Sequence, residues 1–206
     1  MQPLIRVRGV AAPLPQPNVD TDVIMPKRFL KTVTRAGLAA GAFADLRFDA
    51  VGEERPEFVL NRAPWRGAPI LVVGDNFGCG SSREHAVWGL RQLGVRVLLG
   101  TSFAGIFFDN CRRNGVLAVR LPGAARDALL ARVADPARAG LEVDLEAREI
   151  RGEGLRLGFE IEDARRRDLL DGADPIAATL ENAAAIRAWE AEARAARPWV
   201  EIDVRR

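Results

Sequence analysis

The sequence predicts an α/β fold, in which a parallel or mixed sheet is covered by helices. Two observations support this prediction: three short apolar runs have the composition of buried strands, and segments with helical periodicity separate them. The strands are expected at Pro69–Gly74, Val95–Leu99 and Val116–Val119. Strand and helix alternating at this spacing are typical of consecutive βαβ units.

The two connecting helices have recognisable ends. Ser81 and Glu84 fit the capping-box pattern, so the first helix is expected to have Ser81 as its N-cap and to reach about Leu93. Ser102 is expected to cap the second helix, which Asn114–Gly115 closes. Each helix therefore has a start and a stop that agree with the neighbouring strands.

Weaker patterns lie on the N-terminal side of this core. Ile5–Val10 alternates apolar and basic residues and is expected to form the first strand. Three prolines follow it and impose an extended path, which predicts a loop over Asn18–Asp22 rather than a regular element. Pro26–Asp49 is compatible with a helix but is interrupted by two glycines.

Further elements are expected towards the C-terminus. Three strands with alternating patterns and intervening turns predict a hairpin at Leu141–Leu145, Glu149–Arg151 and Leu155–Ile161. A short helix over Ala164–Asp171 is expected to end at Gly172. Asp174–Pro175 supplies the N-cap and first residue of a last helix that reaches about Ala196. We therefore expect one domain over residues 1–206, with a helical extension from about residue 174.

Composition disfavours several classes of function. The 206 residues include 30 basic and 28 acidic side chains, and the net charge of +2 indicates neither a nucleic-acid partner nor an acidic membrane. No apolar run is long enough for a membrane span or a signal-peptide core, so a cytoplasmic protein is expected. Two cysteines, Cys79 and Cys111, and one histidine, His85, cannot assemble a zinc or iron–sulfur site alone. Any metal chemistry must therefore come from a partner.

The turn Gly78–Arg83, between a strand and a helix, has the features of an anion site. Its glycines let the backbone approach a ligand, and a helix start offers free N–H groups. Arg83 adds a planar fork that pairs with carboxylate or phosphate, and Ser81 and Ser82 add two hydroxyls. The alternative is a capped helix whose serines only satisfy backbone amides.

The same turn narrows the choice of anion. The P-loop pattern is absent, and Arg83 stands where the dinucleotide fingerprint has its third glycine. The segment does not read G-x-S-x-G, and the one histidine lies in the same helical turn as the serines, which disfavours serine hydrolysis. A small carboxylate ligand remains.

Four ordered segments resemble a known family over nearly the whole chain. They are NVDTDVIMP (Asn18–Pro26), GDNFGCGSSREHA (Gly74–Ala86), TSFAGIFFDNCRRNG (Thr101–Gly115) and LLDGADPIAATL (Leu169–Leu180). The second closely resembles the substrate loop of the swivelling domain in the aconitase superfamily. Together they resemble the small subunit of bacterial 3-isopropylmalate dehydratase, the isopropylmalate isomerase of leucine biosynthesis.

The resemblance implies a single swivelling β/β/α three-layer domain that closes over a separate large subunit holding a four-iron–four-sulfur cluster. It implies a heterodimeric hydro-lyase that dehydrates 2-isopropylmalate and adds water back to give 3-isopropylmalate, with no metal on this chain. By motif position it implies that Ser81 is the base that takes the carbon-bound proton. Ser82 and Arg83 are then expected to bind a substrate carboxylate.

Other matched positions imply further substrate contacts. Thr21 and Asp22 match the family's Thr-Asp pair near the active site, whereas an Asx-turn loop accounts for either residue alone. Leu30, Lys31 and Thr32 match the stretch that reaches the variable side chain of the substrate. An apolar Leu30 suits an isopropyl group, and core packing is its alternative role.

Several residues of the motifs are expected to be structural. Glu84 fits the cap, His85 is expected to be a scaffold residue, and Cys79 and Cys111 are expected to be small buried side chains.

The chain also departs from the family's usual motifs. The departures are at Val87, Gly89, Gly105, Phe108 and Asp109. None of them removes a proposed catalytic group. They leave open a paralogue that acts on another small hydroxy-diacid, such as citramalate, maleate or dimethylmalate. A stand-alone carboxylate-binding module is the non-enzymatic alternative.

Overall fold

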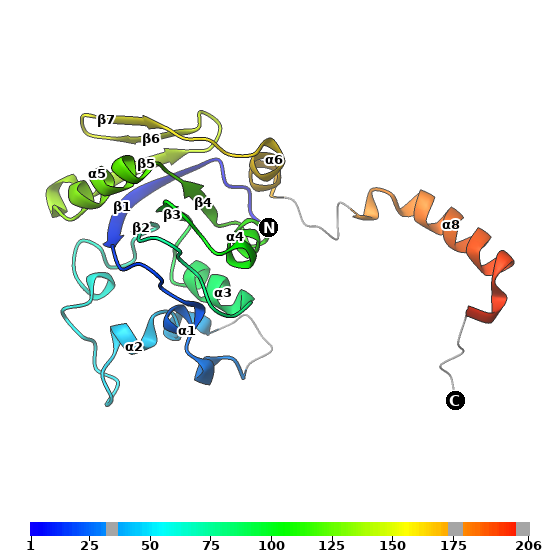
Figure 1. Cartoon of the computed structure of the whole chain (residues 1–206), viewed down its shortest axis with the longest axis horizontal. Helices are drawn as coiled ribbons and strands as arrows, with labels where there is room; N and C mark the ends of the chain where they lie inside the picture. Colours follow the sequence, from blue (N-terminus) through cyan, green and yellow to red (C-terminus); the bar gives the residue numbers. More distant parts are fainter. Residues whose placement is uncertain (32–36, 173–178, 201–206) are drawn as a thin grey trace. The chain divides into compact units, whose positions relative to one another are not determined.

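The computed structural model describes residues 1–31, 37–172 and 179–200 (Figure 1). The chain divides into two compact units, Met1–Gly172 and Ala173–Arg206. The larger unit contains every strand found in the described residues, and the smaller contains α8 (Ala183–Ala196) and the 3₁₀ turn η5 (Pro198–Val200). No helix within the described ranges is long and apolar enough to cross a membrane.

A seven-stranded sheet runs through the described part of the larger unit, in the order β4-β3-β2-β1-β5-β6-β7. Four strands are parallel: β1 (Arg6–Leu14), β2 (Ile70–Val73), β3 (Val97–Gly100) and β4 (Leu117–Arg120). Three continue the sheet as antiparallel neighbours: β5 (Gly140–Asp144), β6 (Glu149–Gly152) and β7 (Leu155–Gly158). In Figure 1, β1 (blue) lies between the other three parallel strands, β2–β4, and the antiparallel strands β5–β7. The predicted α/β class is confirmed.

Helices connect the parallel strands as the sequence predicts. α3 (Glu84–Gln92) joins β2 to β3, and α4 (Gly105–Arg113) joins β3 to β4. The two helices pack against each other. Right-handed crossovers that step in one direction along a sheet place their helices on one face, which explains this contact. Asn114 and Gly115 close α4 as expected, with Gly115 at a φ of 69°.

The first strand is longer than predicted, because it continues through Pro13 to Leu14. Pro13 pairs with Val72 of β2, whereas β5 pairs with β1 only from Arg6 to Val10. The missing N–H of Pro13 therefore leaves no partner on β5 unsatisfied. The predicted loop over Asn18–Asp22 is also partly wrong, since Thr21–Ile24 forms the single-turn helix α1.

The predicted helix over Pro26–Asp49 is wrong for its described residues, which form isolated turns: η1 (Lys27–Phe29), η2 (Leu38–Ala40) and α2 (Ala44–Arg47). Two more 3₁₀ turns are η3 (Val59–Asn61) and η4 (Pro136–Arg138). Helix α5 (Gly123–Val133), which the sequence pattern does not predict, lies against β1 and β2. α6 (Asp163–Asp171) ends at Gly172 as predicted. α8 ends at Ala196 as predicted, and the expected cap Asp174–Pro175 lies outside the described residues.

Candidate active site

Three loops of the larger unit meet at one edge of the parallel sheet. They follow β1, β2 and β3, and their central segments are Asn18–Asp22, Asp75–Arg83 and Thr101–Ala104. The carboxyl ends of parallel strands lie at the same edge, which is where α/β proteins commonly bind ligands. The topology therefore brings together the residues that the motifs single out.

Backbone hydrogen bonds join the first two loops along their length. The Asn18 N–H donates to the Asp75 carbonyl at 2.8 Å, and the Gly78 N–H donates to the Val19 carbonyl at 2.7 Å. The Thr21 N–H then donates to the Cys79 carbonyl at 2.9 Å. The two loops are therefore joined along their length rather than independent. We call the surface formed by Asn18–Asp22 and Asp75–Arg83 the ledge.

Two glycines of the turn are required by its geometry. Gly78 has a φ of 77°, and a Cβ at this position would lie 2.2 Å from the Phe107 ring. Gly80 has a φ of 86°, and a Cβ there would lie 3.4 Å from Cβ of Asp20. Both backbones adopt the left-handed region that side chains disfavour. Gly78 is thus required by both its φ and its close approach to Phe107 of α4, whereas Gly80 is favoured by its φ alone.

The serines and the arginine of the turn differ in exposure. Ser81 and Ser82 are exposed, whereas the Arg83 side chain keeps only 17% of its accessible surface. Asp22 forms an ion pair with Nη1 of Arg83. Thr21 is buried, and its hydroxyl donates to the Ser81 carbonyl at 3.0 Å. The first loop therefore holds both the backbone of Ser81 and the guanidinium of Arg83.

Ser81 is not the N-cap of α3, so this prediction is wrong. The helix begins at Glu84 with Arg83 as its N-cap, and no side chain caps it. The Ser81 carbonyl accepts from the Arg83 N–H at 2.9 Å, which makes a tight turn before the helix starts. Glu84 does not reach back towards Ser81 either, since its carboxylate accepts from Nδ2 of Asn114 at 2.7 Å.

Ser102 is likewise not a helix cap. Helix α4 begins at Gly105 with Ala104 as N-cap, and Oγ of Ser102 accepts instead from the Asn76 N–H at 2.8 Å. The third loop is thereby bonded to the second.

The remaining predicted site residues make no hydrogen bond or ion pair to Ser81, Ser82 or Arg83 within the described residues. Leu30 is half-buried against the hydrophobic core, and Lys31 is exposed directly after it. No hydrogen bond or ion pair in the described part of the chain joins Lys31 to Ser81, Ser82 or Arg83. Thr32 lies outside the described residues. The structure thus unites Thr21, Asp22, Ser81, Ser82 and Arg83, but does not join Leu30 or Lys31 to them.

The expected burial of the two cysteines is confirmed for one of them. Cys111 is buried, and burial raises the pKa of its thiol far above its usual range. The ring of His85 packs against that of Trp88, with centroids 4.6 Å apart, and its scaffold role stays a prediction. Cys79 is only half-buried, because it lies on the surface ledge between the two glycines.

Sequence reasoning missed the residues that hold the start of the turn. Asp75 carries an ion pair to Arg126 of α5, with Nη1 3.2 Å from Oδ1. The Thr101 hydroxyl also donates to Oδ1 of Asp75. Asp75 and Thr101 lie within the motifs, whereas nothing in the sequence pattern points to Arg126.

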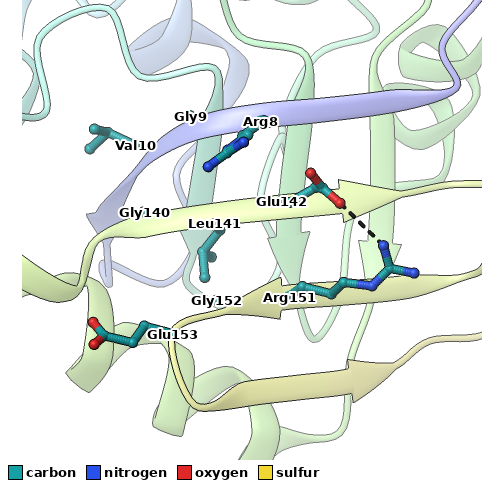
Figure 2. A pocket seen from close by; sticks show the side chains of 9 residues that line it. All are labelled: Arg8, Gly9, Val10, Gly140, Leu141, Glu142, Arg151, Gly152 and Glu153. Carbon is teal, nitrogen blue, oxygen red and sulfur yellow. Dashed lines mark hydrogen bonds and ion pairs between the residues drawn. The ribbon is translucent and has the colours of Figure 1, made fainter.

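A separate hollow lies away from this ledge. Figure 2 shows it over β1, β5 and β6, where Arg8, Leu141 and an Arg151–Glu142 ion pair line a volume of about 510 Å³. None of the residues that the sequence predicts for the site lines it. Within the described residues, no group of three or more His, Cys, Asp or Glu side chains is placed to hold a metal ion.

Comparison with known proteins assigns the fold and the motifs to one class. Residues 1–124 match the family model for the aconitase C-terminal domain, which covers more than half of the chain. Residues 176–203 match the model for the C-terminal domain of the 3-isopropylmalate dehydratase small subunit.

Individual relatives define the family more narrowly than the family models do. The 3-isopropylmalate dehydratase small subunit of Jannaschia sp. is 50% identical over 201 residues, which are 97% of this chain and 100% of that protein. The corresponding protein of Brucella anthropi is 48% identical over 200 residues, again 97% of this chain and 100% of that protein. The chain therefore belongs to the family of 3-isopropylmalate dehydratase small subunits, within the aconitase C-terminal domain class. The crystal structure of 3-isopropylmalate dehydratase from Methanocaldococcus jannaschii matches the fold with a TM-score of 0.64 at 24% identity, covering 90% of this chain and 99% of that one.

Proposed function

We propose that this chain is the small subunit of a hydro-lyase that isomerises 2-isopropylmalate to 3-isopropylmalate by removing water and adding it back. The observation that supports it most directly is the ledge itself: two exposed serines stand beside a guanidinium whose orientation an aspartate fixes. Relatives at about half identity over the full chain bear the corresponding name.

Arg83 is proposed to bind a substrate carboxylate. A guanidinium offers five N–H donors in a planar fork, and Asp22 engages only Nη1, so donors remain for a second carboxylate. Asp22 is proposed to orient this fork rather than to touch the substrate, because two adjacent carboxylates repel each other. Ser82 is exposed next to Arg83 and is proposed to donate its hydroxyl to the same carboxylate.

Ser81 is proposed to be the base of the reaction. Its alkoxide takes the proton from the carbon next to the hydroxyl-bearing carbon, and the C–H electron pair becomes the new double bond as the hydroxyl leaves. Water then adds back to the double bond with its hydroxyl on the neighbouring carbon. Ser81 returns the proton to the carbon that first carried the hydroxyl. The positive charge of Arg83, two residues away, favours the alkoxide over the neutral hydroxyl. Thr21 is proposed to fix Ser81 through the carbonyl bond described above.

A large subunit is proposed as the obligatory partner. The serines lie open on a ledge, so a second surface is needed to enclose the substrate and exclude water. The buried, protonated Cys111 and the isolated Cys79 do not fit a cluster-binding role, which supports a four-iron–four-sulfur cluster held by the partner. When present, that cluster supplies a Lewis acid for the leaving hydroxyl. Leu30, Lys31 and Thr32 are retained as the segment that faces the variable side chain of the substrate.

The proposal is tested by reconstitution. The purified chain is mixed with the large subunit that partners the Jannaschia relative, and 2-isopropylmalate and citramalate are assayed in parallel. The pair should isomerise 2-isopropylmalate, and neither protein should do so by itself. Activity of this chain alone would contradict the proposal, as would a pair that turns over citramalate but not 2-isopropylmalate.

A further inference from the structure

We propose that Arg126 is a positioning residue for this reaction: it fixes the start of the segment Asp75–Arg83 and thereby the places of Ser81 and Arg83. The inference rests on the proposed function of that segment. Arg126 itself belongs to α5, outside the segments that carry the motifs.

The contacts of Arg126 are those of a fixed side chain. Only 12% of its side-chain surface is accessible. Nη1 lies 3.2 Å from Oδ1 of Asp75 and donates to the Val73 carbonyl at 3.4 Å, while Nε donates to Oδ1 of Asp127 at 2.8 Å. The guanidinium thus joins the last carbonyl of β2 to the first carboxylate beyond it. A lysine has the charge but lacks the fork needed to make all three contacts.

Asp75 passes this restraint to the other two loops. Its Oδ1 accepts from the Thr101 hydroxyl, and its carbonyl accepts from the Asn18 N–H. The next residue, Asn76, has a φ of 55° and donates its side-chain amide to Oδ1 of Asn18 at 2.9 Å. A shift of Asp75 would therefore move the loops after β1, β2 and β3 together.

The segment beyond this point is held at both ends and by the first loop. Gly78 and Gly80 have positive φ values, and the serines that follow are exposed, so burial does not hold them. At the far end, the Glu84 carboxylate is bonded to Asn114. Ser81 and Arg83 lie between these two ends and are also held from the first loop by Thr21 and Asp22, so the Arg126–Asp75 pair is the support at the N-terminal end of the segment.

Arg132 provides a matched control. It lies on the same helix and is buried, and its Nη2 donates to the Glu153 carbonyl at 2.7 Å, on the β6–β7 hairpin. Arg126→Met and Arg132→Met remove the same charge from one helix, but only the first removes a contact to the ledge. A general loss of helix packing would affect both variants alike.

The first test measures amide hydrogen exchange of residues 75–83 in the full chain without a partner. In Arg126→Met this segment should exchange about two- to fivefold faster than in the unmodified chain, because an ion pair whose carboxylate is half-exposed is lost. In Arg132→Met it should be unchanged. Asp75→Asn should reproduce the Arg126→Met result, and it serves as the test if Arg126→Met does not fold. Unaltered exchange in the folded variant, or equal acceleration in Arg132→Met, would overturn the inference.

The second test measures kinetics of the reconstituted pair with 2-isopropylmalate. Misplacement of reacting groups by about 1 Å can cost up to about 100-fold, so Arg126→Met should lower kcat more than it raises KM. The double variant with Asp75→Asn should be no worse than the poorer single variant, because both act through one contact. Fully additive losses would overturn the inference. An inactive unmodified pair would instead refute the proposed function, while the exchange test of Arg126 would still decide this inference.

Discussion

Gly78→Ala should destabilise the chain more than its small size suggests. At a φ of 77° an alanine is strained by about 1–2 kcal/mol. Its Cβ would also lie 2.2 Å from Cγ of Phe107, a buried ring that packs edge-on against Phe77 with centroids 5.6 Å apart. Overpacking of this kind adds about 1–3 kcal/mol, so the expected loss in free energy of unfolding is about 2–5 kcal/mol.

The matched control for this prediction is Gly154→Ala. Gly154 has a φ of 63° in the β6–β7 turn, and a Cβ there would meet no atom within 4 Å. Its expected loss is therefore the strain alone, about 1–2 kcal/mol. Urea unfolding of both variants measures the two free energies. Equal losses would refute the packing argument, because they would mean that the Phe107 ring yields without cost.

The other predictions concern the reacting groups and acid stability. Ser81→Ala should lower kcat of the reconstituted pair by about 10²–10⁴-fold while leaving the thermal midpoint almost unchanged, since Ser81 caps no helix; normal turnover would remove it as the base. Arg83→Lys should lower kcat/KM for 2-isopropylmalate and citramalate to a similar degree, because both substrates share the carboxylate that the fork is proposed to bind. A loss on one substrate alone would contradict this. Leu30→Ala should reduce kcat/KM for 2-isopropylmalate more than for citramalate. The difference between the two losses should correspond to about 1–3 kcal/mol of transition-state stabilisation. Equal losses would refute the specificity role of Leu30. The Ala147 N–H, followed by Arg6 and Arg151, holds the pKa of Asp144 below its usual range. This stabilisation is complete above about pH 4, the ordinary aspartate range, and is lost as pH falls through the lowered folded pKa. The difference in unfolding free energy between the unmodified chain and Asp144→Asn should therefore shrink as pH falls, and a constant difference would contradict it.

The fold class was predictable because its signal is local. β2, β3 and most of β4 are buried, and such strands appear in sequence as short uninterrupted apolar runs. Helix α5 gave no such signal, because its buried residues include Arg132 beside Leu129 and Val133. A charged residue on the buried face breaks the apolar periodicity that identifies an amphipathic helix.

The caps were mispredicted for a related reason, since their partners are distant in sequence. Ser81 and Glu84 have the spacing of a capping box. In the folded chain the carboxylate of Glu84 accepts from Asn114 instead, and the Ser81 backbone is held by Thr21 and by the turn to the Arg83 N–H, with the helix beginning only at Glu84. A local pattern cannot register Asn114 and Thr21, which lie 30 and 60 residues away along the chain.

These long-range bonds also explain how exposed groups can be placed accurately. Under the proposed function, Ser81 and Ser82 meet a partner and cannot be buried within their own subunit, so core packing cannot fix their positions. In this chain the restraint comes from polar contacts on either side of the serines, at Asp75 and at Glu84, and from the Asp22–Arg83 pair. Such contacts act on backbone and guanidinium while leaving the serine hydroxyls accessible. It follows that substitutions at these polar contacts should lower turnover more than they lower the free energy of unfolding. Gly78→Ala should do the opposite, because it disturbs the packing of Phe107 in the core.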